Sequence, residues 1–159
     1  MNIHDMDIQI IAAERKHAAD CLESVGESGI GQRYFADHQY TLNLLQAGID
    51  KKELFVGMNG PKAVAGFYWA SGTGMFCRFP YLRILAVKPA FRNKGVGKKL
   101  LDHFEENGFN LASKVFLAVS DFNVEAQRFY KRNRYIRVGI VPDLYKPGIA
   151  EILMMKSSS

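Results

Sequence analysis

The spacing of apolar residues in the first part of the chain predicts one strand and two helices. Residues 7–13 (DIQIIAA) form a short apolar run that is typical of a strand. Residues 14–25 and 36–47 place their apolar side chains on one face of a helix. Between the two helices, residues 26–32 (GESGIGQ) carry two glycines around Ile30, which predicts a loop.

The spacing of apolar residues then changes to the alternation that is typical of strands. Residues 53–58 and 62–70 are strand-like, and Asn59-Gly60 lies between them. Both residues of this dipeptide tolerate positive φ, so we expect a hairpin. The following SGTG, residues 71–74, predicts a loop because it is rich in turn residues.

The second half alternates strands with helices before it closes on two strands. Residues 79–87 predict a strand that Pro89 ends. A helix is expected from about residue 95 to 107, with Gly108 placed to end it. The remaining predicted elements are a strand at 114–119, a helix at 123–133, and strands at 135–141 and 149–155.

The resulting order, β-α-α-β-β-β-α-β-α-β-β, predicts an α/β (α+β) fold with a mixed sheet of about seven strands and about four helices. Its front half is antiparallel, so a regular doubly wound sheet is not expected. The chain has 159 residues, 48% of them hydrophobic, which suits one core. We therefore expect a single domain over residues 1–156 and a flexible tail at 157–159.

Composition narrows the class of protein only slightly. Lys and Arg number 21 against 16 Asp and Glu, a net charge of +5. Cys21 and Cys77 are far apart and predict two free thiols. No signal peptide and no long apolar segment is visible, so we expect a cytoplasmic protein without a membrane partner.

The charge is distributed unevenly along the chain. The 48 residues from Leu54 to Leu101 contain no Asp or Glu but eight Lys or Arg. This segment ends in FRNKGVGKKL, residues 91–100. The cations gather at one turn rather than along a stripe, which favours a small anionic ligand over nucleic acid.

Two common phosphate-binding motifs do not fit this turn. A Walker A loop needs Gly and Ser or Thr where the chain has Arg92 and Lys99, and a dinucleotide fingerprint needs a third glycine where Leu100 stands. The local physics still favours a phosphate. The first amides of a helix lack intrahelical partners, and Gly95 and Gly97 would let an anion approach them.

The stretch LAVKPAFRNKGVG, residues 85–97, resembles the acetyl-CoA motif of the Gcn5-related N-acetyltransferases (the GNAT superfamily). A second resemblance lies downstream, where Asn123, Ala126, Tyr130 and Tyr135 match that family's N-x-x-A-x-x-x-Y signature and the aromatic after it. Arg134 stands where the family usually has Gly. The predicted order of elements also matches the family across nearly the whole chain.

The resemblance implies that the chain binds acetyl-CoA, with the pyrophosphate at the glycine turn and the pantetheine arm along the preceding strand. No metal is expected. The implied cofactor-binding residues are Leu85, Ala86, Val87, Arg92, Asn93, Lys94, Gly95, Val96, Gly97, Lys98 and Asn123.

The implied reaction is direct attack of a primary amine on the thioester in a ternary complex. Tyr130 is the expected catalytic residue, as the proton donor to the leaving thiolate, because a phenol is protonated at pH 7. Asn123 has two compatible roles, which are to cap its helix and to contact the cofactor arm. The general base stays open, the candidates being Asp121, Glu27, His38, Asp143 and an ordered water.

The acceptor also stays open. A small molecule or amino-acid derivative is the first hypothesis. The alternatives are a protein N-terminus or lysine, and a non-catalytic acyl-CoA-binding domain. A homodimer is a further alternative that the sequence leaves open.

Overall fold

The computed structural model describes residues 6–26 and 28–159. These residues form a seven-stranded mixed sheet with five α-helices and two short 3-10 helices, which confirms the predicted fold class. The strand order is β1-β2-β3-β4-β5-β7-β6. The strands are β1 (Ile8–Ala12), β2 (Leu54–Asn59), β3 (Ala63–Met75), β4 (Phe79–Val87), β5 (Lys114–Ser120), β6 (Ile136–Val141) and β7 (Glu151–Ser157). The helices are η1 (Arg15–His17), α1 (Ala18–Gly26), α2 (Gly29–Tyr34), α3 (His38–Asp50), η2 (Pro89–Phe91), α4 (Val96–Leu111) and α5 (Val124–Arg132).

The chain divides into two compact units. Unit 1 comprises residues up to Ala70 together with Ile84–Glu105, and unit 2 comprises Ser71–Arg83 and Glu106–Ser159. Within the described residues, no helix has both the length and the apolar character needed to cross a membrane.

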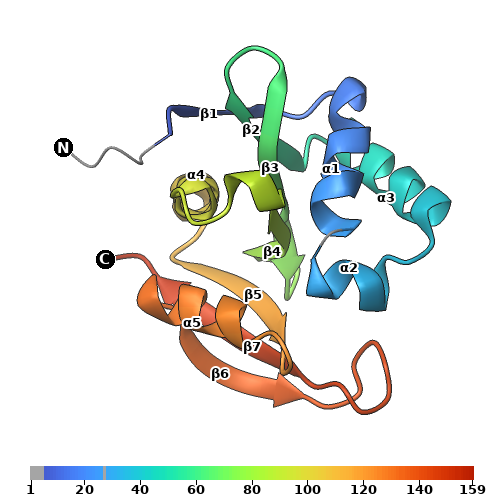
Figure 1. The fold of residues 1–159 in the computed structure, drawn as a ribbon. Coiled ribbons are helices and arrows are strands. Elements are labelled where there is room, and N and C mark those ends of the chain that lie inside the picture. Colours follow the sequence, from blue (N-terminus) through green and yellow to red (C-terminus); the bar gives the residue numbers. More distant parts are fainter. Residues whose placement is uncertain (1–5, 27) are drawn as a thin grey trace. The chain divides into compact units, whose positions relative to one another are not determined.

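One face of the unit 1 strands carries α1 and α3 (Figure 1). Alternate residues of β2 and β3, such as Val56 and Phe67, point to this face and pack against Cys21, Val25 and Leu45. All five are at most 1% exposed. The pairing of β2 with β3 is the predicted hairpin, and Gly60 takes a positive φ of 77° in its turn.

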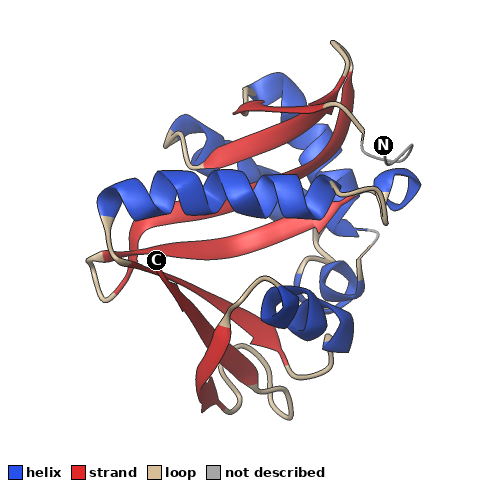
Figure 2. Ribbon diagram, turned by 90° about the vertical axis from the view of Figure 1, so that its left-hand side faces the viewer, coloured by secondary structure: helices blue, strands red, loops and turns tan. Residues whose placement is uncertain are grey.

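The first half of α4 covers the opposite face of the same strands (Figures 1 and 2). Leu100 reaches the sheet there because Gly57 and Gly66 have no side chains. A Cβ added at these glycines would lie 3.5 Å and 3.3 Å from Leu100. Beside them, the Tyr68 hydroxyl and His103 Nδ1 are 2.8 Å apart. Tight helix–sheet packing therefore fixes where α4 begins.

Unit 2 is built around β5, whose sequence KVFLAVS is almost entirely buried. It pairs in parallel with the start of β4, at Tyr81 and Leu82, and antiparallel with β7. The strand β6 pairs with β7 and ends the sheet. Figure 2 shows these strands with α5 beside them.

Three local predictions were wrong, and each misread a glycine. Residues 29–34 form α2 rather than a loop, capped by the Ser28 hydroxyl, which accepts from the Gly31 amide. A Cβ at Gly31 would lie 2.0 Å from the Val25 carbonyl oxygen, so this glycine serves close packing. The SGTG segment continues β3 to Met75, because strand pairing overrides the turn propensity.

The third misread glycine is Gly108, which lies inside α4 rather than at its end. The helix continues to Leu111. A Cβ at position 108 would approach Val115 to 2.7 Å and Pro80 to 3.4 Å, so glycine allows this turn to pack. At the C-terminus, Ser157 belongs to β7 and pairs with Lys114, so the strand includes the first residue of the predicted tail.

Candidate functional site

In unit 1, the turn between β4 and α4 changes direction through two left-handed residues. After Val87, the 3-10 helix η2 begins at Pro89. Asn93 and Gly95 then take φ values of 59° and 80°. Glycine adopts this conformation without steric cost, and Asn tolerates it better than most residues. The turn thereby presents the beginning of α4 to solvent, with residues 92–95 all exposed.

The first hydrogen bond of the α4 ladder runs from the Lys99 amide to the Gly95 carbonyl, at 3.1 Å. The amides of Val96, Gly97 and Lys98 precede that bond and lie outside the ladder. They carry the positive end of the helix dipole. Gly95 is exposed and Gly97 half-buried, which leaves the approach to these amides open for an anion.

The cations of the turn are partly used to hold its backbone. Arg92 Nε donates to the Val87 carbonyl (3.2 Å), and Lys94 Nζ donates to the Ala90 carbonyl (3.1 Å). In the structure, both cations fold back onto the turn and keep their charge beside it.

Two other cations of the acid-free segment are paired with acids. Lys98 contacts Asp102 one helical turn later at 2.5 Å. Lys88 binds Asp20 (2.6 Å) and Glu23 (3.0 Å), both on α1. Burial opposes the charged form of Lys88, but the hydrogen bonds that it donates to these two acids outweigh burial, so its pKa is raised. Lys88 thus ties α1 to the start of the turn.

The end of β4 supplies three more of the predicted cofactor residues, Leu85, Ala86 and Val87. Ala86 is buried against the α1–α3 core, at 5% exposed, while Leu85 and Val87 are half-buried. Unit 1 therefore brings together Leu85–Val87 and the predicted residues 92–98. Asn123 and Tyr130 belong to unit 2.

In unit 2, Asn123 caps α5. Its side-chain oxygen accepts from the Ala126 amide at 3.2 Å. The capping role suggested by the sequence is therefore present, whereas the contact with a cofactor stays a prediction.

Tyr130 lies on the buried face of α5. Its ring is 8% exposed and packs edge-on to Phe129 and Tyr135, with centroids 5.2 Å and 5.7 Å apart. Burial raises the pKa of the Tyr130 phenol above its ordinary value. The phenol consequently stays protonated at neutral pH, as a proton donor requires.

The candidate bases from the sequence are placed less favourably. Asp121 accepts from the Ala150 amide (3.1 Å) and Asp143 from the Gly148 amide (2.7 Å), so both carboxylates stabilise loops. His38 is exposed at the first position of α3. Glu27 lies outside the described residues.

Sequence reasoning missed a buried carboxylate, Glu151, at the start of β7. It is 4% exposed, and its Oε1 accepts from the Ser120 hydroxyl at 2.8 Å. The charge of the Glu151 carboxylate also affects the pKa of Tyr81 on β4. Burial, a hydrogen bond with Tyr145 and the nearby Glu151 all raise the pKa of Tyr81. The sequence offered one signal for Glu151, which is a single acid at the start of the apolar strand EILMM. An acid in such a strand is rarely buried unless it has a partner, so a paired carboxylate could have been expected there.

Among residues 6–26 and 28–159, no group of three or more His, Cys, Asp or Glu side chains is arranged to hold a metal ion. The candidate groups are backbone amides in unit 1, which can donate to an anion, and phenols and a carboxylate in unit 2, which can exchange protons. These groups suit anion binding and proton transfer.

Comparison with known proteins gives one family match and one curated relative. The sequence model of the acetyltransferase (GNAT) family matches residues 22–134. An uncharacterized N-acetyltransferase of Methanocaldococcus jannaschii is 40% identical over 74 residues, which are 45% of this chain and 47% of the relative. The match thus spans about half the length of this relative.

Solved structures share the fold across nearly the whole chain. A GNAT-family acetyltransferase from Bacillus cereus has a TM-score of 0.78 at 19% identity, covering 96% of this chain and 98% of its own. A putative acetyltransferase from Salmonella typhimurium, solved with its cofactor acetyl-CoA, has a TM-score of 0.72 at 16% identity. The matched region covers 95% of this chain and 94% of the Salmonella chain.

Proposed function

The chain belongs to the acetyltransferase (GNAT) family, and we propose that it transfers an acetyl group from acetyl-CoA to a primary amine. The proposed acceptor is a small molecule or an amino-acid derivative. The reaction is direct attack in a ternary complex, without a metal ion.

One observation carries the proposal, namely the turn that leads into α4. The amides of Val96, Gly97 and Lys98 precede the helical ladder, and the turn in front of them is exposed and cationic. A pyrophosphate matches this arrangement in charge and in acceptor number. Two further supports are the relative named an N-acetyltransferase and the Salmonella structure that contains acetyl-CoA.

In the proposed mechanism, backbone groups of Leu85, Ala86 and Val87 hold the pantetheine arm. The neutral amine attacks the thioester carbon, the C–N bond forms and the C–S bond breaks. Tyr130 gives its proton to the departing thiolate and later regains one from solvent. The amine loses one proton, so the products are the amide and CoA.

We propose Glu151 as the acceptor of that amine proton. It is the buried carboxylate of unit 2 within the described residues, and Tyr81 and Tyr145 lie in the same polar cluster. A buried ionisable group in such a setting is a candidate for acid–base chemistry.

The anion site is tested by thermal unfolding with acetyl-CoA, CoA and ATP side by side. Saturating acetyl-CoA or CoA should raise the unfolding midpoint by roughly 5–10 °C, with ATP giving little change. Gly97→Gln should remove the shift while the unliganded midpoint stays near that of the parent. Gly26→Gln is the matched control, because a Cβ there meets nothing within 4 Å. An unchanged shift in the Gly97 variant would refute the phosphate assignment.

The role of Glu151 is tested by thiol release with a panel of amines. Glu151→Gln keeps an acceptor for the Ser120 hydroxyl but cannot take up a proton. Turnover at neutral pH should fall about 10²-fold and recover partly at higher pH, where the free amine is neutral without help. Equal activity at every pH would assign Glu151 a structural role.

A further inference from the structure

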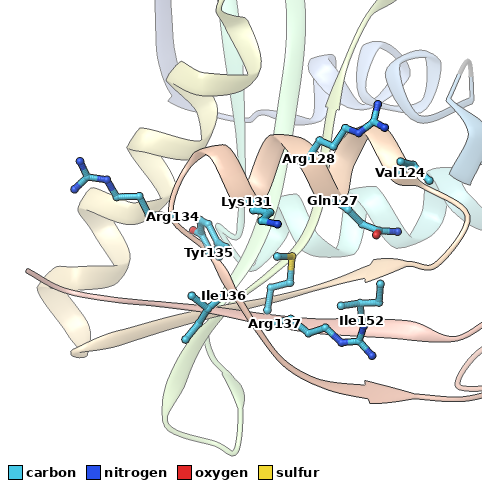
Figure 3. A pocket seen from close by; sticks show the side chains of 10 residues that line it. Val124, Gln127, Arg128, Lys131, Arg134, Tyr135, Ile136, Arg137 and Ile152 are labelled. Carbon is cyan, nitrogen blue, oxygen red and sulfur yellow. The ribbon is translucent and has the colours of Figure 1, made fainter.

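A basic pocket lies on unit 2 between α5 and the last two strands, β7 and β6 (Figure 3). Its volume is about 740 Å³. Four of its lining residues are cations and none is an acid, the cations being Arg128, Lys131, Arg134 and Arg137. In Figure 3, Arg134 extends to the left and Arg128 to the upper right, with Lys131 between them and Arg137 below, beside the strands. Neither the CoA assignment nor the proposed chemistry uses this surface.

The four cations of this pocket have no acidic partner among the described residues. Within the described part of the chain, none of the four forms an ion pair or a side-chain hydrogen bond, and all four are exposed. By contrast, Arg15, Lys88 and Lys98 each bind an acid. Four unpaired like charges around one pocket repel one another, and an anionic partner would relieve that repulsion.

Arg134 occupies a position that disfavours a side chain. Its φ of 71° is in the left-handed region, at the residue pair that follows α5. A non-glycine residue there costs about 1–2 kcal/mol. Backbone strain of this kind often accompanies a functional role. Glycine would make the same turn without the strain. The strain is therefore consistent with a role for the arginine side chain.

The pocket continues into an open sheet edge. The strand β6 is last in the strand order and pairs only with β7 among the described strands. Its apolar side chains face solvent, with Ile136, Val138 and Ile140 at 56%, 44% and 49% exposed. Edge strands are usually protected by charge, proline, a β-bulge or a covering segment. In β6, Arg137 is the one charged residue, and the pairing with β7 shifts register between Arg137 and Gly139. Here the edge combines unpaired backbone groups, apolar side chains and neighbouring cations.

We propose that this surface binds an acidic polypeptide segment from a partner protein, which adds to β6 as an extra strand. Main-chain hydrogen bonds to the free edge would supply affinity, and apolar side chains of the partner would cover Val138 and Ile140. Its acidic side chains would reach Arg134, Arg137 and Lys131. The six residues of β6 accommodate a segment of similar length, roughly 20 Å.

Charge and the exposed apolar side chains of β6 distinguish the three possible occupants of this surface, which are an acidic partner segment, a second copy of the chain and a small anion. A second copy of this chain carries a net charge of +5, so it is a poorer match to four cations than an acidic partner. A small anion would pair with the cations but leave the apolar edge of β6 uncovered. An acidic, partly apolar strand satisfies both features.

The test measures binding of a fluorescent ten-residue peptide that alternates Glu with Val, by anisotropy at low and physiological salt. The same peptide with Gln in place of Glu is the ligand control. Arg137→Glu should weaken binding of the Glu peptide about tenfold. Arg132→Glu makes the same charge change on α5 outside the pocket and should alter affinity less than about twofold.

Val138→Lys separates strand addition from simple charge attraction. A lysine in the middle of an edge strand blocks pairing, so this variant should bind at least about tenfold more weakly although it adds a cation. The midpoint of thermal unfolding of each variant verifies that unit 2 remains folded.

Five outcomes would overturn the proposal. They are the absence of binding to the Glu peptide at low salt, equal loss in the Arg132 variant, and tighter binding by the Val138 variant. The fourth is a dimer in sedimentation that Val138→Lys dissociates without peptide, since β6 would then be covered by a second copy. Equal binding of a DNA fragment of the same charge would likewise reject a polypeptide ligand.

Discussion

At the scale of single residues, the proposed chemistry depends most directly on Tyr130. Its ring is held between Phe129 and Tyr135, and burial raises the pKa of its phenol. A phenol whose pKa is raised in this way remains protonated at neutral pH. Such a group can donate a proton in the transition state, and its aromatic ring also contributes to the core of unit 2.

Replacing Tyr130 by Phe separates these two contributions. The ring stays, so the free energy of unfolding should change by less than about 1 kcal/mol. Turnover at saturating acetyl-CoA should fall about 10²-fold, because the leaving thiolate loses its proton donor. The Kd for CoA should hardly change. Steady-state kinetics by thiol release, together with calorimetric titration of CoA, measure both quantities.

Tyr135→Phe is the control for this experiment. It also removes one hydroxyl from a buried tyrosine of unit 2, 2% exposed, but no chemical role is assigned to that hydroxyl. Turnover of the Tyr135 variant should stay within about twofold of the parent, a negligible difference in transition-state energy. A Tyr130 variant that retains full turnover would leave Tyr130 as a packing residue only.

The residues differ in how far the sequence could identify them. Tyr130 and Asn123 occupy a spaced motif that resembles the family signature, and this resemblance implies a role for both. The local pattern around Asn123 also predicts its capping role. Glu151 has no such motif. Its burial depends on Ser120 and Tyr81, which are distant in sequence and become neighbours only through strand pairing. Tertiary environments of this kind leave little trace in local sequence.

At the scale of elements, glycines on the sheet determine how closely α4 and the strands approach. Gly66 lies in β3, where a Cβ would be 2.5 Å from the Ala86 carbonyl oxygen and 3.3 Å from Leu100. The first of these neighbours is backbone and cannot rotate away. The space at Gly66 is therefore part of what positions the end of β4 and the beginning of α4.

Gly66→Ala should consequently lower the free energy of unfolding by about 2–3 kcal/mol, through overpacking against β4. Gly139→Ala is the matched control in a strand, because a Cβ there meets nothing within 4 Å. The control should change stability by less than about 1 kcal/mol, or raise it slightly. Urea unfolding measures both variants. Equal effects would mean that glycine entropy, rather than the close approach of β4, governs this position.

The pattern of apolar residues predicted most elements, because these elements are long enough to show a regular repeat of apolar side chains. The sheet strands and the helices α1, α3, α4 and α5 were expected near their observed positions. The failures occurred at Gly31, Gly74 and Gly108, which act through close packing rather than through turns. Sequence alone cannot distinguish a glycine that bends the chain from one that makes room for a neighbour.

At the scale of the whole molecule, the distribution of charge matters more than its sum. The net charge is only +5, but 48 consecutive residues lack any acid. Ion pairs with Asp20, Glu23 and Asp102 then offset two of the cations in this segment. The positive field that remains near the α4 turn comes from Arg92, Lys94 and the helix dipole.

This balance predicts a salt dependence that only a phosphate-bearing donor should show. Acetyl-CoA carries several negative charges, so its affinity should fall about three- to tenfold between roughly 0.05 and 0.5 M NaCl as the field is screened. Acetyl-pantetheine has the same reactive arm without phosphates. It should bind much more weakly than acetyl-CoA at low salt, with little salt dependence. Calorimetric titrations of both donors across the salt series supply the comparison. If the two donors bound equally at low salt, the turn would not be recognising phosphate, and the assignment of residues 92–98 would have to be abandoned.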